Sequence, residues 1–465
     1  MKTAYLIGIK GVGMTALAKY LVEDGYVVEG SDNSQSYVTD AVLAEKNIKV
    51  YDHFDEKNIS SINPDVVIVS AAYDQTNPEV AEAEKRNLKI IYYSEALGMI
   101  TADQKLIAVA GVHGKTTTTS LIALMLEQAK MSPSFIIGAG EVPILGTNAR
   151  KGQGEYFVLE ADEYRKSPTN FDSKFLDINP EIAIISSIEL DHPDVFASEE
   201  DIYRAFYRFA CRVPRSGEIL INIDYQKSKK LVASLADRKF QTYGFSEDAD
   251  WQVIDVREKD KTSFSIKHGG QIYGPYELEV PGKHNVLNAT TAVIIAELLN
   301  INEQTLKETF AKFKGVQRRF QEIANINGVV IVDDYAHHPT AVKRTLEAAK
   351  AKYADSKIWC IFQPHTFSRT EKLLKDFGLA FDSADKVILT DIYASARELS
   401  GNVTIVDLLN EIKKSNEKVI YLHDWKKIKE YVFAFAKAPV VILTIGAGDV
   451  YKLGLELVDL YKNEA

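Results

Sequence analysis

Residues 106–119 read Leu-Ile-Ala-Val-Ala-Gly-Val-His-Gly-Lys-Thr-Thr-Thr-Thr, an apolar run that leads directly into glycine, lysine and threonine. This order predicts a buried strand, a phosphate-binding loop and a helix. Backbone N–H groups from Gly111 to Lys115 would surround phosphate oxygens, while the Lys115 ammonium balances their charge. The Thr116 hydroxyl is suited to hold Mg²⁺. The stretch therefore predicts an α/β unit that binds a nucleoside triphosphate.

This loop departs from the common phosphate-loop pattern at one position. The pattern places a first glycine at position 109, where this sequence has Val109. A strand, turn and helix that bind no phosphate therefore remain an alternative at this point. The apolar strand before the turn and the run of threonines after it favour the phosphate loop.

Length and composition indicate an ordered protein of several domains. The chain has 465 residues, more than one hydrophobic core usually organises, and we expect about three domains. Hydrophobic residues make up 46% and charged residues 26%, as in ordinary folded proteins. The formal net charge of -10 argues against a nucleic-acid partner.

The cysteines and the apolar runs indicate the compartment. Cys211 and Cys360 are too few for a disulfide framework, which favours a reducing environment. The start of the chain lacks the pattern of a signal peptide, and no apolar run reaches about 18 residues. We therefore expect a cytoplasmic protein without membrane insertion.

The N-terminal region begins as a βαβ unit. A strand over residues 3–9 carries Gly8 and is followed by Gly11, Gly13 and a helical pattern. A second strand ends at Asp32, about where the acidic residue of a Rossmann domain contacts ribose. Because Lys10 and Gly11 do not reproduce the full glycine fingerprint, a purely structural turn remains an alternative. Later strand patterns lead us to expect a Rossmann-like domain over residues 1–103.

The second predicted domain covers residues 104–316 and contains the phosphate loop. Apolar strands over residues 156–160 and 182–188 end on polar residues. Because ligands of parallel sheets bind beyond the carboxyl ends of the strands, four side chains should gather beside Lys115: Glu160, Asp162, Asp191 and His192. Alternating apolar and polar residues over 245–280 predict an antiparallel patch, and hence a mixed sheet.

The third predicted domain covers residues 317–465. The strand pattern starts again near Gly315, and an apolar strand over residues 329–332 leads into Asp333-Asp-Tyr-Ala-His-His-Pro339. Further strand patterns alternate with helices as far as residue 445. This order predicts a C-terminal Rossmann-like α/β domain.

Eight ordered motifs resemble those of the Mur ligases, the ATP-dependent amide-bond ligases of peptidoglycan synthesis. The resemblance runs nearly from end to end. Its motifs are Gly8-Ile-Lys-Gly-Val-Gly-Met14, Gly111-Val-His-Gly-Lys-Thr-Thr117, Glu160-Ala-Asp-Glu163, Glu189-Leu-Asp-His192, His284-Asn-Val-Leu-Asn288, Arg318-Arg-Phe320, Asp333-Asp-Tyr-Ala-His-His-Pro339 and Gln363-Pro-His-Thr-Phe-Ser-Arg-Thr370.

The resemblance implies ATP and Mg²⁺ as cofactors and assigns residues to both. The implied ATP-binding residues are Gly111, His113, Gly114, Lys115, Thr116, Thr117, Asn285, Asn288, Arg319 and Asp334. The implied Mg²⁺ ligands are Thr116, Glu160 and His192. His192 is an unusual ligand for Mg²⁺, and a hydrogen-bonding role remains an alternative for it. Asn285 could instead cap the helix predicted to start there.

The resemblance also implies the reaction and its substrates. The lactyl carboxylate of UDP-N-acetylmuramic acid would attack the γ-phosphate of ATP, and an amine would then attack the acyl phosphate. The implied residues for the UDP-sugar are Gly8, Gly11, Val12, Gly13, Ser31, Asp32 and Ser70. The implied catalytic residues are Lys115, His192, His338, His365 and Arg369, with His337 as a further candidate. Any of the last three histidines could instead be a structural hydrogen-bonding residue.

The amine substrate divides the motifs between two branches of the family. Glu160-Ala-Asp-Glu-Tyr164 and Phe171-Asp-Ser-Lys-Phe175 look like the members that recycle a tripeptide. The segments 315–321, 363–370 and 391–393 look like the members that add L-alanine. Because the third domain chooses the amine, we expect L-alanine. We also expect a monomer or weak homodimer.

Three departures and two other protein classes complete the interpretation. Lys10 and Val112 stand where alanine-adding members usually have glycine and threonine, and residues 202–209 offer no lysine for carbamylation. The absence of this lysine fits both the alanine-adding and the tripeptide-recycling members. A nicotinamide-dependent oxidoreductase would explain only the first glycine turn. A P-loop ATPase without ligase activity would not need the segment from Asp334 to His338.

Overall fold

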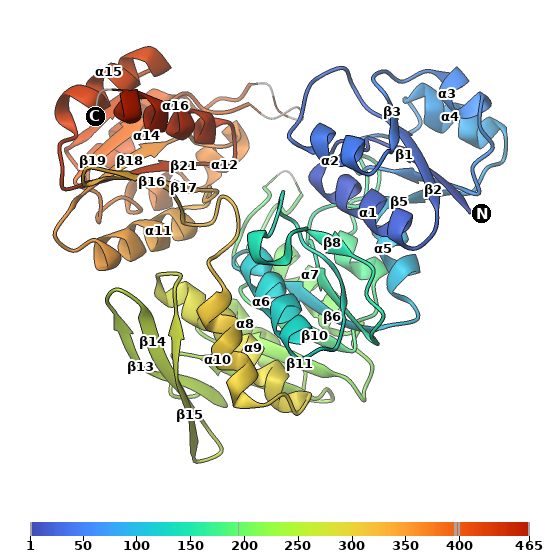
Figure 1. The fold of residues 1–465 in the computed structure, drawn as a ribbon, viewed down its shortest axis with the longest axis horizontal. Coiled ribbons are helices and arrows are strands. Elements are labelled where there is room, and N and C mark those ends of the chain that lie inside the picture. The colour runs from blue at the N-terminus through green and yellow to red at the C-terminus, as the bar shows by residue number, and fades with distance from the viewer. Residues whose placement is uncertain (1, 194, 395–397, 399, 464–465) are drawn as a thin grey trace.

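Three α/β domains follow one another in the computed structural model, which describes residues 2–193, 195–394, 398 and 400–463. Each domain is built around its own sheet. Figure 1 shows the blue N-terminal domain and the red C-terminal domain on the same side of the central domain. The predicted class of three α/β domains is confirmed. In the described part of the chain, no helix is long and apolar enough to cross a membrane.

The N-terminal domain has a parallel sheet of five strands in the order β3-β2-β1-β4-β5. Its strands are β1 (Thr3–Ile7), β2 (Val27–Ser31), β3 (Lys49–Tyr51), β4 (Val66–Val69) and β5 (Ile90–Tyr92). Its helices are α1 (Val12–Glu23), α2 (Thr39–Glu45), α3 (Glu56–Ser60), α4 (Pro78–Lys85) and α5 (Tyr93–Thr101). Every residue of β4 is buried, because helices cover both faces of a parallel sheet.

The central domain has ten strands in the order β15-β14-β13-β12-β11-β10-β6-β9-β7-β8. They are β6 (Lys105–Ala110), β7 (Ser134–Ile136), β8 (Ala149–Arg150), β9 (Tyr156–Glu160), β10 (Ile182–Ile185), β11 (Glu218–Asn222), β12 (Phe240–Gly244), β13 (Trp251–Glu258), β14 (Thr262–His268) and β15 (Gln271–Leu278). The last three form the predicted antiparallel patch, which confirms the mixed sheet.

Two buried helices of the central domain pack against each other beside its sheet. They are α6 (Lys115–Gln128) and α9 (Lys283–Leu298). Residues 285–296 of α9 are all buried, so this helix has no polar face that contacts water. The other helices are α7 (Glu199–Ala210), α8 (Gln226–Ser234) and α10 (Glu303–Lys312), with short 3₁₀ turns at Pro143–Leu145 and Lys174–Asp177.

The described residues of the C-terminal domain form a sheet of six strands in the order β16-β17-β21-β18-β19-β20. They are β16 (Gln321–Ile326), β17 (Val329–Asp334), β18 (Lys357–Phe362), β19 (Lys386–Leu389), β20 (Val419–Tyr421) and β21 (Val440–Ile445). The helices are α11 (Pro339–Lys352), α12 (Phe367–Lys372), α13 (Leu374–Gly378), α14 (Ile405–Lys413), α15 (Trp425–Phe435) and α16 (Val450–Asn463). Only β16 runs antiparallel to its neighbour.

The two outer domains meet the central domain through different kinds of contact. Apolar side chains of the N-terminal and central domains form one continuous core, in which the rings of Tyr20 and Phe157 lie 5.3 Å apart. The C-terminal domain has apolar clusters of its own. It meets the central domain through ion pairs and hydrogen bonds, described below. The polar contact is where ligand-binding side chains from both domains meet.

Candidate active site

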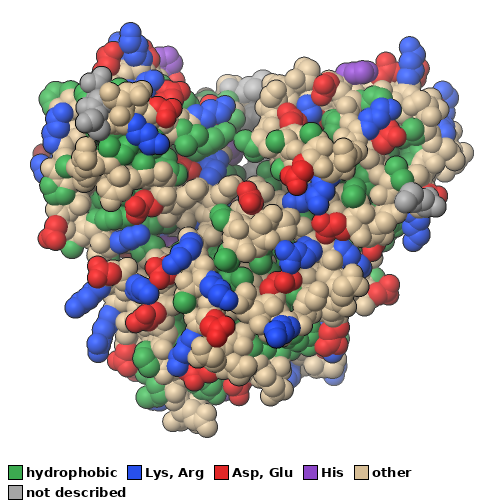
Figure 2. All heavy atoms as spheres, viewed as in Figure 1, with side chains coloured by type: hydrophobic (Ala, Val, Ile, Leu, Met, Phe, Trp, Pro, Cys, Tyr) green, Lys and Arg blue, Asp and Glu red, His purple; other side chains and the backbone are tan. Residues whose placement is uncertain are grey.

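A cavity of about 480 Å³ is lined by residues of all three domains. Figure 2 shows the surface hollowed between the two upper lobes. The predicted site residues that line it are Val12, Gly13, His113, Gly114, Lys115, Thr116, Thr117, Glu160, His192, Asn285, Asn288, Arg319, Asp334, His337, His338, His365 and Arg369. Gly111 and five predicted residues of the N-terminal domain lie outside this lining: Gly8, Gly11, Ser31, Asp32 and Ser70.

The phosphate loop connects β6 to the N-terminus of α6. Gly114 has φ +79° and precedes the helix, and a Cβ there would lie 2.3 Å from Asn288 Oδ1. A Cβ at Gly111 would lie 2.1 Å from Ser186 Oγ. Only glycine avoids both the strained backbone and the clash. The N-terminus of this 14-residue helix, which is the positive end of its dipole, therefore lines the cavity.

Lys115 is held by a buried carboxylate. Its Nζ donates a 2.6 Å hydrogen bond to Oε2 of Glu163, whose side chain is 1% exposed. Burial disfavours the charged form of Lys115, but Glu163, Asp162 and Glu160 outweigh burial and raise its pKa. The lysine is therefore a cation. The motifs did not predict Glu163 as a site residue. The acidic residues directly after the strand were the signal that could have identified it.

Glu160 and Thr116 offer oxygen atoms at the strand end, as predicted. Thr116 Oγ1 donates to Glu160 Oε1 at 3.1 Å, and the N–H of Gly138 donates to Oε2 at 2.8 Å. Burial raises the pKa of Glu160. A carboxylate and a hydroxyl are the hard ligands that Mg²⁺ prefers. These residues fit a magnesium ion.

His192 lies beside this group in a strained backbone conformation. Its φ is +53°, uncommon for a residue other than glycine, and its N–H donates to its neighbour Asp191. Its Nε2 lies 3.4 Å from Oε1 of Glu163. Strained backbone of this kind is concentrated at functional sites. His192 lines the cavity together with Lys115 and Glu163.

Two further residues that sequence reasoning missed line the cavity toward the N-terminal domain. Lys174 Nζ donates to Asp162 Oδ2 at 2.8 Å and lies 5.8 Å from the centre of the Tyr93 ring. The Tyr93 hydroxyl would lie 2.9 Å from a Cβ at Gly13. These contacts connect the start of α1 to Asp162, which follows β9. No motif signalled Tyr93, because it lies where β5 passes into α5.

Asn285 and Asn288 lie near the start of α9, where Asn288 approaches Gly114 of the phosphate loop. The alternative that Asn285 caps the helix is wrong, because α9 begins at Lys283 and Gly282 is its N-cap. The Asn285 amide instead donates to the carbonyl of Pro281 at 2.7 Å, and Asn288 donates to Asn285 at 3.1 Å. Both amides therefore have fixed orientations beside the phosphate loop.

Arg319 and Asp334 reach this region from the C-terminal domain. Arg319 Nη2 donates to Thr116 Oγ1 at 3.4 Å across the domain boundary. The Asp334 carboxylate accepts 2.7 Å hydrogen bonds from the N–H groups of Phe320 and Ala336. Burial nevertheless raises the pKa of Asp334, and Arg319 opposes that rise.

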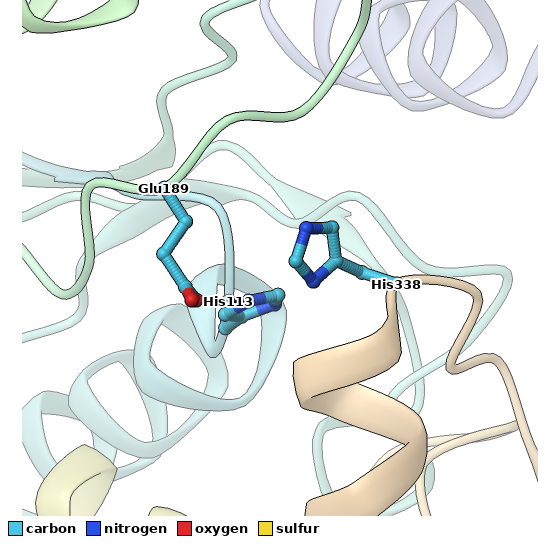
Figure 3. A group of neighbouring side chains, drawn as sticks. All are labelled: His113, Glu189 and His338. Atoms are coloured by element: carbon cyan, nitrogen blue, oxygen red, sulfur yellow. Dashed lines mark hydrogen bonds and ion pairs between the residues drawn. The ribbon is translucent and has the colours of Figure 1, made fainter. Parts of the chain in front are cut away.

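Three side chains from both domains converge in Figure 3: His113, Glu189 and His338. His113 Nε2 lies 2.7 Å from Glu189 Oε2, and the two imidazole rings lie 4.9 Å apart. Burial opposes ionisation of Glu189, but His113 and His338 outweigh it and lower its pKa to about 2. Burial lowers the pKa of His338 to about 4. At neutral pH, Glu189 is therefore ionised and the His338 imidazole is neutral.

His338 also has a structural role. Its Nδ1 accepts from the N–H of Thr340 at the start of α11, and Nε2 lies 3.2 Å from the carbonyl oxygen of Leu190. Thr340 Oγ1 donates to Glu189 at 3.0 Å. Because backbone groups contact both ring nitrogens, His338 fastens the two domains together as well as lining the cavity. His337 similarly contacts the carbonyl of Tyr335 at 2.9 Å.

Arg369 and His365 complete the C-terminal side. Arg369 Nε donates to Asp191 Oδ1 at 2.8 Å, with both side chains at most 6% exposed. Its Nη1 lies 3.3 Å from Nδ1 of His365, whose ring stacks on Tyr393. Thr366 between them has φ +69°, an outlier for a β-branched residue. Strain is therefore concentrated where this guanidinium enters the cavity.

In the N-terminal domain, Asp32 and Lys10 form a buried loop network. The N–H of Lys10 donates to Asp32 Oδ2 at 2.9 Å. Lys10 Nζ donates to the carbonyls of Asn33 and Gln35 and to Asp52. The lysine that departs from the family pattern therefore supports the loop after β2.

Comparisons with known proteins match every part of this architecture. Residues 3–105 match the model described as "Mur ligase family, catalytic domain". Residues 109–296 match "Mur ligase middle domain", and residues 318–448 match "Mur ligase, glutamate ligase domain". The three matches follow the order of the three sheets.

Individual relatives extend the match over the full length. UDP-N-acetylmuramate–L-alanine ligase of Desulfitobacterium hafniense (strain Y51) is 38% identical, covering 98% of this chain and 99% of the relative. The structure of UDP-N-acetylmuramate-alanine ligase from Thermotoga maritima has a TM-score of 0.82 and 24% identity, covering 100% of both chains. A murein peptide ligase from Psychrobacter arcticus 273-4 has a TM-score of 0.74 and 23% identity, covering 100% of this chain and 99% of its own.

Proposed function

Because this chain belongs to the Mur ligase family, we propose that it is an ATP-dependent, ADP-forming ligase that joins L-alanine to the lactyl carboxylate of UDP-N-acetylmuramic acid. Peptidoglycan synthesis is the process that this reaction serves. One observation carries the proposal: a single cavity is lined by all three domains, so three substrates can meet there. The full-length relative named for this reaction supports the choice of substrates.

The reaction has two steps. The lactyl carboxylate attacks the γ-phosphorus of ATP, and an acyl phosphate and ADP form. The amine of L-alanine then attacks the acyl carbon, and inorganic phosphate leaves with the carboxylate oxygen. A carboxylate is a poor electrophile, and the phosphoryl group turns its oxygen into a good leaving group. Positioning and electrostatic stabilisation supply most of the rate enhancement in such a transfer.

The residues divide between the substrates. The Lys115 ammonium and the N–H groups of α6 hold the triphosphate, while Asn285 and Asn288 lie on the adenine side. Arg319 and Asp334 close the nucleotide site from the C-terminal domain. Thr116, Glu160 and His192 would hold Mg²⁺, which offsets charge on the transferring phosphoryl group when bound.

The remaining predicted residues serve the other two substrates. Arg369 is suited to hold the carboxylate of L-alanine, and His365 lies 3.3 Å from its guanidinium. His338 lines the same cavity. In the N-terminal domain, the glycines before α1 face the diphosphate of the sugar nucleotide. The residues for that substrate remain Gly8, Gly11, Val12, Gly13, Ser31, Asp32 and Ser70.

The proposal includes the organisation of the chain. Residues 1–103 bind the UDP-sugar, 104–316 bind ATP and 317–465 bind the amino acid. The protein acts in the cytoplasm as a monomer or weak homodimer, where ATP and the nucleotide sugar are available.

Product analysis tests the function. Purified protein is mixed with ATP, Mg²⁺ and UDP-N-acetylmuramic acid, and L-alanine, other amino acids or the recycled tripeptide are added separately. We expect an L-alanine adduct by mass spectrometry, with one ADP released per adduct. An adduct with the tripeptide alone would move the assignment to recycling. ADP release without the sugar nucleotide, and no adduct, would instead indicate a P-loop ATPase.

A further inference from the structure

Glu163 is a buried carboxylate with one hydrogen-bonded oxygen and one oxygen without such a bond. Oε2 accepts from Lys115 Nζ at 2.6 Å. Oε1 is buried and accepts no hydrogen bond from any described residue, and His192 Nε2 lies 3.4 Å away. At 1% exposure, water does not compensate this group. The carboxylate therefore depends on the Lys115 ammonium at Oε2 and on the His192 ring beside Oε1.

ATP binding would draw the Lys115 ammonium away from the Glu163 carboxylate. The Lys115 ammonium is the group that the proposed function places on the phosphates, so the lysine must share or leave Glu163. Removing one partner of a buried ion pair is strongly destabilising, because it leaves the other charge buried without compensation. A replacement cation at Glu163 would offset this cost.

The other lysine and arginine side chains that line the cavity contact groups other than Glu163. Lys174 pairs with Asp162, and Arg369 pairs with Asp191. Arg319 donates to Thr116, and Arg344 donates to the Tyr225 hydroxyl. Among the described residues, the ion pairs of Glu163 are those with Lys115 and His192. The replacement charge must therefore come from solution.

We propose that Glu163 exchanges Lys115 for a divalent cation when the triphosphate binds, and that this cation is shared with His192. Magnesium takes octahedral ligands at about 2.0–2.1 Å, so adjacent ligand atoms lie about 3 Å apart. The 3.4 Å separation of Glu163 Oε1 and His192 Nε2 is close to that value. Lys115 and the cation thus change places, which couples nucleotide binding to Mg²⁺ beyond the direct contact of Mg²⁺ with phosphate. The inference rests on the proposed function only for ATP as a substrate.

Calorimetry with a non-hydrolysable ATP analogue tests this exchange in the full chain. Affinity is measured with excess Mg²⁺ and with EDTA for the wild type and for Glu163→Gln. Without Mg²⁺, the variant should bind the analogue about tenfold more tightly than the wild type, because no carboxylate competes for Lys115. The enhancement of affinity by Mg²⁺ should fall by about tenfold or more. An unchanged enhancement in a folded Glu163→Gln protein would overturn the proposal.

Two further variants keep the result interpretable. Glu218 is a matched control, because it is a buried carboxylate of the same domain that pairs with Lys239 outside the cavity. Glu218→Gln should leave the Mg²⁺ enhancement as in the wild type. If Glu163→Gln does not fold, Glu163→Asp decides: it keeps the charge but moves the oxygens, and should weaken Mn²⁺ binding measured by electron paramagnetic resonance. Unchanged Mn²⁺ binding in that variant would overturn the proposal.

The proposed function and this inference can fail separately. A wild-type protein that makes no L-alanine adduct but shows the expected Mg²⁺ pattern would lose the ligase assignment and keep the role of Glu163. An active ligase in which Glu163→Gln retains the Mg²⁺ enhancement would give the opposite result.

Discussion

Arg369 of the C-terminal domain donates a 2.8 Å hydrogen bond to Asp191 of the central domain, and both side chains are almost fully buried. The two domains are therefore closed on each other through a desolvated ion pair. Charges placed so deeply depend strongly on their partners, because water cannot replace a lost contact.

Asp191→Asn should open this contact. The change leaves the Arg369 guanidinium without a charged partner at about 5% exposure, which costs about 3–5 kcal/mol in buried pairs. We expect a larger radius of gyration in small-angle X-ray scattering, and partial closure when all substrates are added. Asp172→Asn is the control, since its pair with Arg208 is exposed. A variant as compact as the wild type would contradict this role of Asp191.

Lys115→Ala should abolish ATP turnover and also destabilise the protein. The variant loses the phosphate contact, and it leaves the buried Glu163 without its cation at a cost of about 3–5 kcal/mol. ADP release and thermal unfolding measure the two effects. The double variant Lys115→Ala/Glu163→Gln should recover stability but not turnover. Undiminished ADP release in the single variant would refute the assigned role.

Lys174→Met should weaken binding of the sugar nucleotide. Lys174 is a cation on the cavity wall between Tyr93 and Asp162, and the sugar nucleotide carries a diphosphate and a carboxylate. We expect KM for UDP-N-acetylmuramic acid to rise about tenfold, the equivalent of one lost charged contact, while KM for ATP stays within a factor of about two.

Lys166→Met is the matched control for that measurement. Lys166 lies in the same segment, is equally exposed and pairs with Asp177, but does not line the cavity. It should leave both KM values unchanged. Equal changes in both lysine variants would mean that loss of a buried ion pair, rather than substrate contact, explains the result.

His338 should make the stability of the closed chain depend on pH. Its pKa in the folded protein is about 4, below the ordinary value of 6.5, so the unfolded chain binds more protons between these values. The contribution of His338 to the free energy of unfolding is complete above pH 6.5 and is lost as the pH falls toward 4. The slope is about 1.4 kcal/mol per pH unit for one proton.

His338→Asn isolates this contribution. Asparagine can still accept from the N–H of Thr340 and cap α11, but it does not titrate. Between pH 6.5 and 4, the melting temperature of this variant should fall less than that of the wild type. Parallel curves for the two proteins would exclude His338 as a source of the pH dependence.

The repeating strand and loop patterns made much of the fold predictable. The strand Tyr156–Glu160 has the predicted bounds, because it is a continuous apolar run that ends on a polar residue. Short edge strands such as β8 and β20 were missed, since two or three residues carry no period. β16 was missed because its residues are only partly buried.

The site was predictable where a motif lies at a strand end. Lys115, Glu160 and His192 lie at or beyond the carboxyl ends of β6, β9 and β10, which are parallel strands of the mixed central sheet, and all three side chains line the cavity. Tyr93 and Lys174 could not be found in this way, because only tertiary packing brings α5 against the short helix at Lys174–Asp177. The double role of His338 was also hidden, since its contact with Leu190 joins residues 148 positions apart.

The contact made by residues 189–192 has a consequence for domain exchange. Glu189, Leu190 and Asp191 from the central domain meet Thr340, His338 and Arg369 from the C-terminal domain, while each domain keeps its own apolar core. A chimera that replaces the C-terminal domain could thus fold each unit correctly and still not assemble the cavity. Compatibility between donor and recipient depends on these few polar pairs, which would have to be transplanted as a set.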